Sequence, residues 1–386
     1  MEQKIPYRRV LSIAIVFILS GLQVMNAFVR ERQNLWLITL IIAVGVIPLL
    51  LIFARLNALN PGKNFFEIVF SSCGKVFGYI ISALYIYYAL KLSGVTFRYL
   101  TEFIQMVSMP ETSKLVTLAF FAFLCFYILQ SGLDVMSRFC SIVLPAVIII
   151  QIIIITFSVG IYDFSYLRPI DPEQYVPMLT SSFKLCAFSF GETVFLIGIV
   201  ACTDFSKKRI TPDKNRLNKQ KKPSSPFSVY LWALLVGALT ISAVMLSNLL
   251  VLGHGSMFKL YFPYYDAVSL IKIGDFITRI EVISVISYIL TVVVKVSVCI
   301  YCATTGFCYM FKMRSSKVLT FIFVAAAAIF SMFVFKDAVD MFERDGYPIY
   351  ESYVFQLAIP LVVWLKCEID RILNKRKPLQ DKGMVS

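Results

Sequence analysis

The chain has 386 residues, of which 59% are apolar, with a mean hydropathy of +0.78 and a formal net charge of +14. Soluble domains contain closer to about half apolar residues, so a water-soluble globular domain is excluded. In a soluble protein a net charge of +14 would favour binding to nucleic acid. Here the basic residues lie between apolar runs, so we expect them to set orientation and contact membrane lipid, and we predict no nucleic-acid partner.

Ten apolar segments are long enough to serve as transmembrane helices, which need about 20 residues each. A lipid environment leaves unpaired backbone groups no partner, and the alternating pattern of a membrane barrel is absent, so we expect an all-α integral membrane protein. The fourth segment is the shortest, and the eighth is long enough to tilt. The segments are approximately 10–29, 35–54, 76–96, 114–130, 139–161, 180–203, 227–253, 279–311, 317–335 and 349–366.

Lysine and arginine are concentrated in alternate connections, starting from the N-terminus, whereas the opposite connections are richer in acidic residues. The positive-inside rule therefore predicts that both termini are cytoplasmic. We expect a single transmembrane domain, 1–386, with a basic cytoplasmic loop at 204–226 and a cytoplasmic tail at 367–386. The charge and Pro/Ser content of the loop indicate a solvated, flexible segment.

Small and polar residues interrupt two segments at corresponding places. Each interruption begins about eleven residues into its segment, roughly 16 Å along a helix and therefore near the bilayer midplane. The two segments stand five apart and cross in opposite directions, which is typical of an inverted five-plus-five repeat with discontinuous helices 1 and 6. The repeats would span about 10–161 and 180–366. The interrupting residues are Ser20, Gly21, Gln23 and Asn26 in the first segment and Ser189, Gly191, Glu192 and Thr193 in the sixth.

Broken helices present unpaired amides and half-helix dipoles to a small polar ligand. Alternatively, Gly and Ser there merely permit close helix packing. Two ionisable residues, Glu192 and Lys295, lie at similar depth, where each charge costs at least about 2.5–3.5 kcal/mol to insert. Three interpretations stay open: a structural ion pair, ligand contacts, or a proton-linked carboxylate. Tyr88 in the third segment is a further candidate for lining a pocket, with plain packing as the alternative.

Catalytic and metal-binding motifs are absent from the sequence. There is no phosphate-binding loop, nucleophile elbow or paired Cys/His set, and the nine cysteines are scattered through apolar runs. Cys299 and Cys302 form a CxxC without a nearby His or second pair, which favours packing, and the lone His254 lies in a loop. We therefore predict no enzyme activity, no cofactor and no metal site, and expect ligand binding with conformational change.

Five sequence landmarks, in order, carry a resemblance to a known family: NPGKNFFEI at 60–68, MPETSKLV at 109–116, RPIDPEQYVP at 168–177, SFGETVF at 189–195 and YPIYESYVFQLAIPLVVWL at 347–365. Over nearly its whole length the chain resembles the B subunit of bacterial endospore germinant receptors. These form the spore germination permease family of the amino acid–polyamine–organocation superfamily. The resemblance implies a LeuT-like fold with a pocket between helices one, three, six and eight. It also implies A-type and C-type partner subunits and a location in the spore inner membrane.

Two functions follow from these observations. The first is a nutrient sensor that binds a small germinant, expected to be an amino acid, in a midplane pocket and triggers germination. The alternative is a proton-coupled amino-acid transporter with Glu192 as the proton-linked group; a nutrient-gated ion channel differs from the sensor only in where ions pass. The candidate ligand-binding residues are Ser20, Gly21, Gln23, Tyr88, Ser189, Gly191, Glu192, Thr193 and Lys295.

Overall fold

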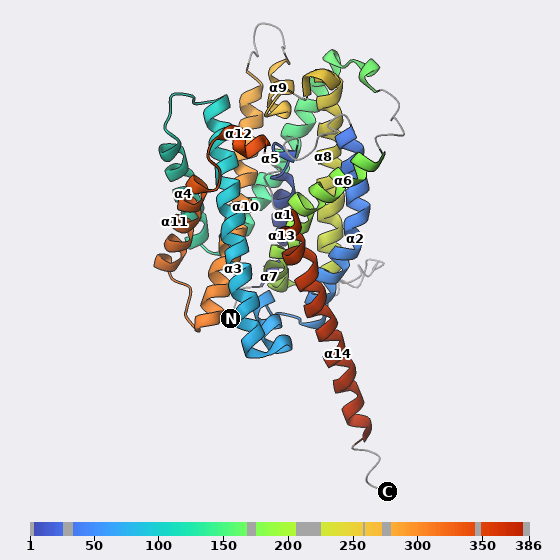
Figure 1. The fold of residues 1–386 in the computed structure, drawn as a ribbon, viewed down its shortest axis with the longest axis vertical. Coiled ribbons are helices and arrows are strands. Elements are labelled where there is room, and N and C mark those ends of the chain that lie inside the picture. The colour runs from blue at the N-terminus through green and yellow to red at the C-terminus, as the bar shows by residue number, and fades with distance from the viewer. Residues whose placement is uncertain are drawn as a thin grey trace, which may run out of the picture.

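The computed structural model describes residues 4–25, 34–167, 175–205, 225–257, 259–271, 279–343 and 349–380. Its helices run mostly along one long axis, and the last helix projects beyond the bundle at the end where the N-terminus also lies (Figure 1). Most of the basic loop, Asn26 and residues 168–174 of the connection between the fifth and sixth predicted segments lie outside the described residues.

The helices are α1 (Tyr7–Leu19), α2 (Leu35–Leu59), α3 (Phe65–Val107), α4 (Lys114–Gln130), α5 (Leu133–Ser158), α6 (Tyr175–Leu185), α7 (Leu196–Ala201), α8 (Pro226–Met257), α9 (Pro263–Ser269), α10 (Glu281–Phe311), α11 (Lys317–Phe333), α12 (Ala338–Glu343), α13 (Ile349–Tyr353) and α14 (Ile359–Gln380). Short 3₁₀ helices are η3 (Val159–Ile161), η4 (Phe164–Tyr166) and η7 (Gly191–Phe195), and π-helices are η6 (Cys186–Phe190) and η8 (Val354–Ala358). The strands of the described residues are β1 (Ile5–Pro6) and β2 (Thr203–Asp204).

Seven helical segments of the described chain are long and apolar enough to cross a membrane. They are Leu35–Leu59, Phe65–Val107, Leu133–Ile161, Met178–Ala201, Pro226–Gly253, Glu281–Phe311 and Tyr350–Leu373. Two shorter apolar helices, α4 and α11, coincide with the fourth and ninth predicted segments, and α1 with the first. The all-α membrane fold is thus confirmed, apart from one pair of two-residue strands.

Two helices extend furthest beyond their predicted boundaries. The third segment, expected at 76–96, extends to 43 residues because an amphipathic arm joins it through a kink at Gly74, where φ is +79°, and because the helix continues to Val107. A capping box starts this arm, since Asn64 and Glu67 bond each other's backbone N–H groups. At the other end of the chain, α14 continues to Gln380, so most of the predicted tail is helical.

The strand pair connects the two interrupted segments. β1 directly precedes α1, β2 directly follows α7, and the strands pair in parallel with Ile5 opposite Thr203. The N–H of Ile5 also donates to the carbonyl of Cys202 at 2.9 Å. The chain therefore leaves this end in α1 and returns to it in α7, which is the opposed direction that an inverted repeat requires.

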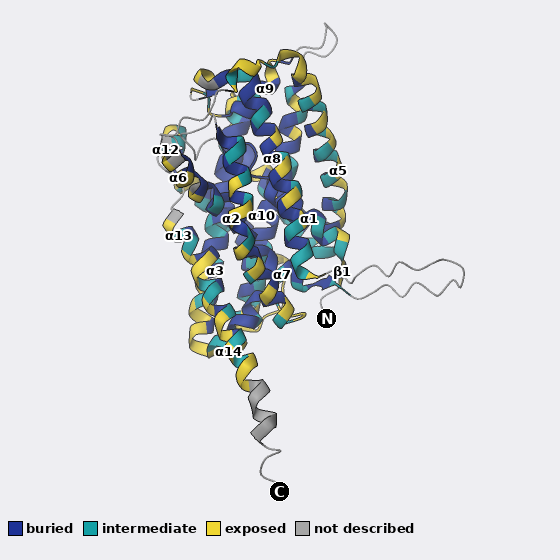
Figure 2. Cartoon of the chain, turned by 90° about the vertical axis from the view of Figure 1, so that its right-hand side faces the viewer, coloured by how far each residue is buried: buried dark blue, intermediate teal, exposed yellow. Residues whose placement is uncertain are grey.

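The interrupted segments and α10 form the centre of the bundle. In an apolar 18-residue stretch of the Met178–Ala201 segment 82% of the residues are buried, and in one of α10 78% are, against 28% in the corresponding stretch of the segment containing α5. Figure 2 shows the same contrast, with buried residues along the axis and exposed ones on the outside. Because the outward residues are largely apolar, the outer helices present a surface suited to lipid, and the polar interruptions are enclosed by protein.

Candidate functional site

The first interruption begins where α1 ends at Leu19. The N–H groups of Gly21 and Leu22 bond carbonyls three residues back, at 3.3 and 3.1 Å, so the regular α-helical ladder stops there. The hydroxyl of Ser20 donates to the carbonyl of Phe17 at 2.6 Å and takes up one of the released acceptors. The predicted discontinuity of helix 1 is confirmed.

The second interruption is a change in helical winding. After α6 the chain widens into the π-helix η6 and then tightens into the 3₁₀ helix η7 before α7 begins. Gly191, at the junction, keeps right-handed angles of φ −68° and ψ −30°. The hydroxyl of Thr193 donates to the carbonyl of Phe190 at 2.6 Å. Helix 6 is therefore discontinuous as predicted, and π segments of this kind occur frequently at functional sites.

The two interruptions touch each other through Gly21 and Ser189. A Cβ atom added to Gly21 would lie 2.0 Å from the hydroxyl oxygen of Ser189 and 3.3 Å from the ring of Phe188. Only a residue without a side chain fits at that separation. The hydroxyl of Ser189 is buried and has no hydrogen-bond partner in the described part of the chain. Gly21 therefore permits a close approach of the two interruptions, but the Ser189 hydroxyl at this contact lacks a hydrogen-bond partner.

Glu192 and Lys295 form a buried ion pair. The Nζ of Lys295, from α10, lies 2.6 Å from Oε2 of Glu192, and the two side chains are 3% and 0% exposed. The ammonium also lies 4.7 Å from the centre of the Phe188 ring and 5.8 Å from that of Phe17. Of the three interpretations that the sequence left open, this geometry is that of a structural pair.

Gly191 contacts a residue that the sequence analysis did not single out. A Cβ added to Gly191 would lie 2.0 Å from Oε1 of Gln356, which belongs to the π-helix η8. The amide nitrogen of Gln356 donates to the carbonyl of Ala187 at 2.6 Å and to the hydroxyl of Tyr88 at 2.7 Å. Gln356 therefore joins η8, the second interruption and α3. Its signal was available, since it is the one polar residue in the run VFQLAIPLVVWL at 354–365.

Tyr88 lies in an aromatic stack beside the second interruption. Its ring is stacked on Phe355 with centroids 4.5 Å apart and on Phe195 with centroids 5.4 Å apart. Tyr85, one helical turn earlier, donates its hydroxyl to the carbonyl of Phe355. Tyr88 thus orients Gln356 through its hydroxyl and packs through its ring, and both roles support Gly191.

Gln23 has a different environment from the other predicted residues. It is 1% exposed, and neither atom of its side-chain amide has a hydrogen-bond partner among the described residues. It lines a cavity of about 10 Å³ together with Gln151 and Tyr264. The hydroxyl of Tyr264 donates to Gln151 at 2.6 Å, and Gln151 donates to Ser287 at 3.2 Å. Gln151 also had a sequence signal, as the one polar residue in a run of isoleucines.

The assembled site is a neutral, hydrogen-bonding environment at the centre of the bundle. Among the residues that form this site, Glu192 and Lys295 carry charge, and they neutralise each other. The amide of Gln23 and the hydroxyl of Ser189 offer donors and acceptors that the protein itself does not satisfy. The described part of the chain brings no three His, Cys, Asp or Glu side chains together in a way that could hold a metal ion.

Solved structures share this fold. A Na⁺-coupled sialic acid symporter, in a substrate-bound outward-open state, has a TM-score of 0.55 and 10% identity, over 92% of this chain and 80% of the symporter chain. A manganese transporter of Eremococcus coleocola has a TM-score of 0.60 and 12% identity, over 93% and 78%. At such low identity the likeness concerns the fold, which is LeuT-like, as expected.

Relatives in sequence point to a single family. Spore germination protein KB of Bacillus subtilis (strain 168) is 21% identical over 389 residues, covering 99% of this chain and 98% of the relative. YfkT of the same organism is 23% identical over 335 residues, covering 86% and 87%. A family model described as "Spore germination protein" matches residues 4–338. The match includes both interruptions and the Glu192–Lys295 pair, and the chain belongs to the spore germination protein family.

Proposed function

We propose that this chain is the B-type, nutrient-sensing transmembrane subunit of a spore germinant receptor. It binds a small germinant, an amino acid, between the two helix interruptions and triggers germination. The observation that carries the proposal is the buried side-chain amide of Gln23, which has no partner in the described part of the chain. A buried amide without partners costs about 1–3 kcal/mol, which a bound polar ligand recovers.

The site as described is closed. The cavity beside Gln23 has a volume of about 10 Å³, far below the roughly 300 Å³ of small ligand pockets. An amino acid therefore enters only if Gly21 and Ser189 separate, which changes the angle between α1 and the second interruption. A ligand that binds only the separated state shifts the equilibrium toward it, and partner subunits detect that shift.

The ion pair favours a ligand without net charge. Glu192 and Lys295 already neutralise each other, so a ligand carrying one net charge would leave an uncompensated charge in the bundle. A zwitterionic amino acid brings both signs. Its carboxylate is suited to the hydroxyl of Ser189, and its ammonium to the amide oxygen of Gln23.

The remaining assignments belong to the same proposal. The subunit acts with A-type and C-type partners in the spore inner membrane, with both termini cytoplasmic, and it catalyses no reaction. The repeats extend over about 10–161 and 180–366. The match to germination proteins and the LeuT-like fold support this assignment at the level of family and architecture.

The test is germination of spores that lack this subunit, with single nutrients supplied one at a time and the gene restored in a parallel strain. We expect loss of response to one class of amino acid and recovery in the restored strain. A normal response to that class after every related subunit is also removed would contradict the sensing function.

A proton-coupled amino-acid transporter is the second candidate. It is favoured by the fold, which solved transporters share, and by the mid-depth carboxylate of Glu192. Uptake of radiolabelled amino acid into vesicles containing the purified chain separates the two functions. The sensor predicts saturable binding without accumulation, whereas the transporter predicts accumulation that depends on a proton gradient.

A further inference from the structure

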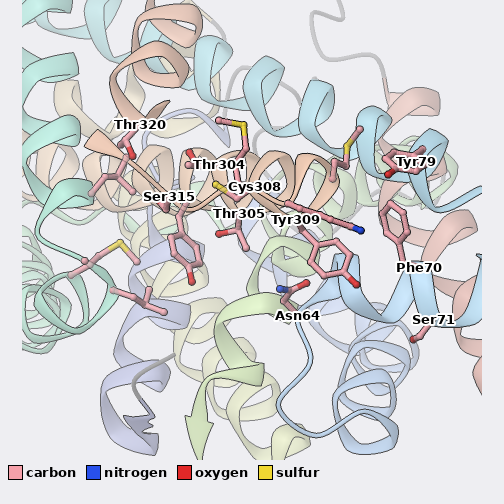
Figure 3. Close-up of a pocket in the computed structure, with 18 of the residues that line it drawn as sticks. Asn64, Phe70, Ser71, Tyr79, Thr304, Thr305, Cys308, Tyr309, Ser315 and Thr320 are labelled. Carbon is pink, nitrogen blue, oxygen red and sulfur yellow. The ribbon is translucent and has the colours of Figure 1, made fainter. Parts of the chain in front are cut away.

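A large cleft lies far from the midplane, at the end of the bundle from which α14 projects. Its volume is about 900 Å³. Figure 3 shows side chains of α10, among them Thr305 and Tyr309, on one side and Asn64, Phe70 and Tyr79 of the α3 region on the other. The turn between α4 and α5 and the connection from α10 to α11 complete its walls. This is the end at which the positive-inside rule predicts the cytoplasm.

Two lysines line the cleft, and no acidic residue does. Neither Lys75 nor Lys312 forms an ion pair among the described residues, whereas Lys114 pairs with Glu102 and Lys295 with Glu192. Glu67 interacts electrostatically with Tyr309 but accepts a hydrogen bond from the N–H of Asn64. Asp134, next to the lining residue Leu133, is neutralised by ion pairs with Arg9 and Arg138. The cleft therefore presents a net positive charge.

The backbone fixes one of these lysines in an unusual place. Lys312 ends α10 in the left-handed region, with φ +52°, and is the one non-glycine residue with positive φ in the described part of the chain. For a residue other than Gly, Asn or Asp this conformation is uncommon and strained. The structure holds a cation at this position although a glycine would fit more easily, which points to a role for the side chain.

The depth of the lysines matches that of lipid headgroups. The apolar stretch of α10 ends at Phe311, immediately before Lys312. On α3, Lys75 follows the kink at Gly74 and immediately precedes the outward-facing Val76 and Phe77, which are 71% and 64% exposed. Both lysines therefore lie where an apolar span meets its polar end.

The walls combine apolar and hydroxyl-bearing surface. Phe70 forms edge-to-face contacts with Tyr79 and Tyr309, at 5.0 and 5.3 Å between ring centres. Hydroxyl groups line the same cleft; they belong to Ser71, Thr304, Thr305, Ser315 and Thr320. A volume of this size is too large for a lone phosphate and falls within the roughly 300–1,000 Å³ of small-molecule sites. Cations, hydroxyls and aromatic rings together suit an amphiphile with an anionic head.

We propose that this cleft binds the headgroup of one anionic phospholipid, with its phosphate engaged by Lys75 and Lys312 and its glycerol and upper acyl chains against the aromatic wall. The two lysines could equally bind free inorganic phosphate. We favour a phospholipid because the aromatic wall of the cleft offers apolar surface that inorganic phosphate cannot use. The site is separate from the midplane interruptions and does not depend on the proposed sensing function.

The test uses the purified full chain in mild detergent and counts bound lipids by native mass spectrometry, with phosphatidylglycerol and phosphatidylcholine supplied in equal amounts. We expect one retained phosphatidylglycerol that phosphatidylcholine does not replace. In the double variant Lys75→Gln, Lys312→Gln its apparent affinity falls at least about tenfold, because each lysine near a membrane surface contributes about 1 kcal/mol. Lys317→Gln, an exposed lysine at the same end that does not line the cleft, is the matched control and retains the lipid.

A second measurement works on a chain that keeps both lysines. In a Tyr309→Trp variant, brominated phosphatidylglycerol quenches the new fluorescence more than brominated phosphatidylcholine does. The three natural tryptophans do not line the cleft, so the unmodified chain supplies the background. Equal retention of both lipids, unchanged retention in the double variant, equal quenching, or displacement of the lipid by millimolar inorganic phosphate would each overturn the proposal.

Discussion

The two helix interruptions occupy matching places in the two halves of the fold, yet the protein satisfies them differently. In the second half Glu192 pairs with Lys295, and the space in front of Gly191 is filled by Gln356. In the first half the amide of Gln23 is buried without a partner beside a small polar cavity. The charges of the second interruption therefore neutralise each other, although the Ser189 hydroxyl and the Oε1 of Gln356 there are buried without hydrogen-bond partners in the described residues. In the first interruption both polar atoms of the Gln23 side-chain amide are without partners, so a ligand can add two hydrogen bonds at this one residue.

This difference indicates a division of roles. Gln356, Tyr88 and the ion pair fix the second interruption to α3, α10 and η8. The first interruption contacts that assembly through Gly21 and Ser189, whose hydroxyl is unsatisfied. We infer that the second half is a platform and that the first half moves against it when a ligand binds.

The largest effect is expected at Gly191, because the platform leaves it no space. An added Cβ would lie 2.0 Å from Oε1 of Gln356, so Gly191→Trp should abolish the germination response, and Gly191→Ala should weaken it while leaving protein abundance unchanged. Spore germination and immunoblotting measure the two quantities. Gly198, on the same segment, has no atom within 4 Å of an added Cβ, so Gly198→Ala should respond normally. A normal response from Gly191→Trp would mean that the pocket is elsewhere.

The ion pair should dominate the stability of the platform. Glu192→Gln or Lys295→Met alone leaves one buried charge without its partner, which costs about 3–5 kcal/mol of unfolding free energy. The double variant removes both charges and should lose much less. Thermal unfolding of the purified chains gives the comparison. If the two single losses simply added in the double variant, the residues would not be acting as a pair.

The contact between the halves should show a smaller effect that a second substitution reverses. Gly21→Ala places a methyl group 2.0 Å from the Ser189 hydroxyl, and overpacking of this kind costs about 1–3 kcal/mol. Ser189→Gly removes the clashing atom, so the combined variant should recover most of the loss. The unfolding temperature measures this recovery, whereas germination should stay impaired because Ser189→Gly also removes the hydroxyl proposed to bind the germinant carboxylate. Failure of Ser189→Gly to rescue Gly21→Ala would show that the strain arises at Phe188 or in the backbone.

The sequence predicted the features that follow from the free-energy cost of placing charged and polar groups inside a membrane. A Glu and a Lys inside a membrane are expensive enough that few arrangements remain, and the pairing of Glu192 with Lys295 was one of three foreseen. The breaks at Ser20–Gln23 and Ser189–Thr193 were visible because small and polar residues interrupt long apolar runs. The orientation of the termini and the repeat boundaries stay predictions.

Features that depend on long-range partners could not be predicted. Gln356 and Gln151 stood out as isolated polar residues, but their contacts with Gly191 and with the cavity beside Gln23 require elements far apart in sequence to meet. Hydropathy also did not show the amphipathic arm at the start of α3, because its apolar residues lie on one face and are interrupted by polar ones. The winding of η6 and η7 likewise depends on packing, since none of these residues has a positive φ that a glycine would signal in the sequence.

A substitution at Gln23 tests most directly whether the first half of the fold binds the ligand. Gln23→Leu replaces an unsatisfied buried amide by an apolar group of similar size, so the unfolding free energy should stay the same or rise by about 1 kcal/mol. The germination response should nevertheless fall, because the ligand loses its partner. A variant that is destabilised would show that Gln23 is a structural group. A variant with normal germination would place the ligand away from the first interruption.

The smallest expected effect is a pH dependence on the side of the first interruption. The helix α9 covers the cavity beside Gln23 through Tyr264, and burial raises the pKa of Asp266, on the same helix, from 3.8 to about 6. The folded state then binds more protons than the unfolded state between about pH 4 and 6. The contribution of Asp266 to stability therefore declines as the pH rises through this range. Asp266→Asn should flatten that part of the unfolding curve, and because Asp266 is partly exposed, the change should be modest. A slope of the opposite sign would mean that a cation, such as Arg279 near the neighbouring Tyr265, stabilises the charged carboxylate instead.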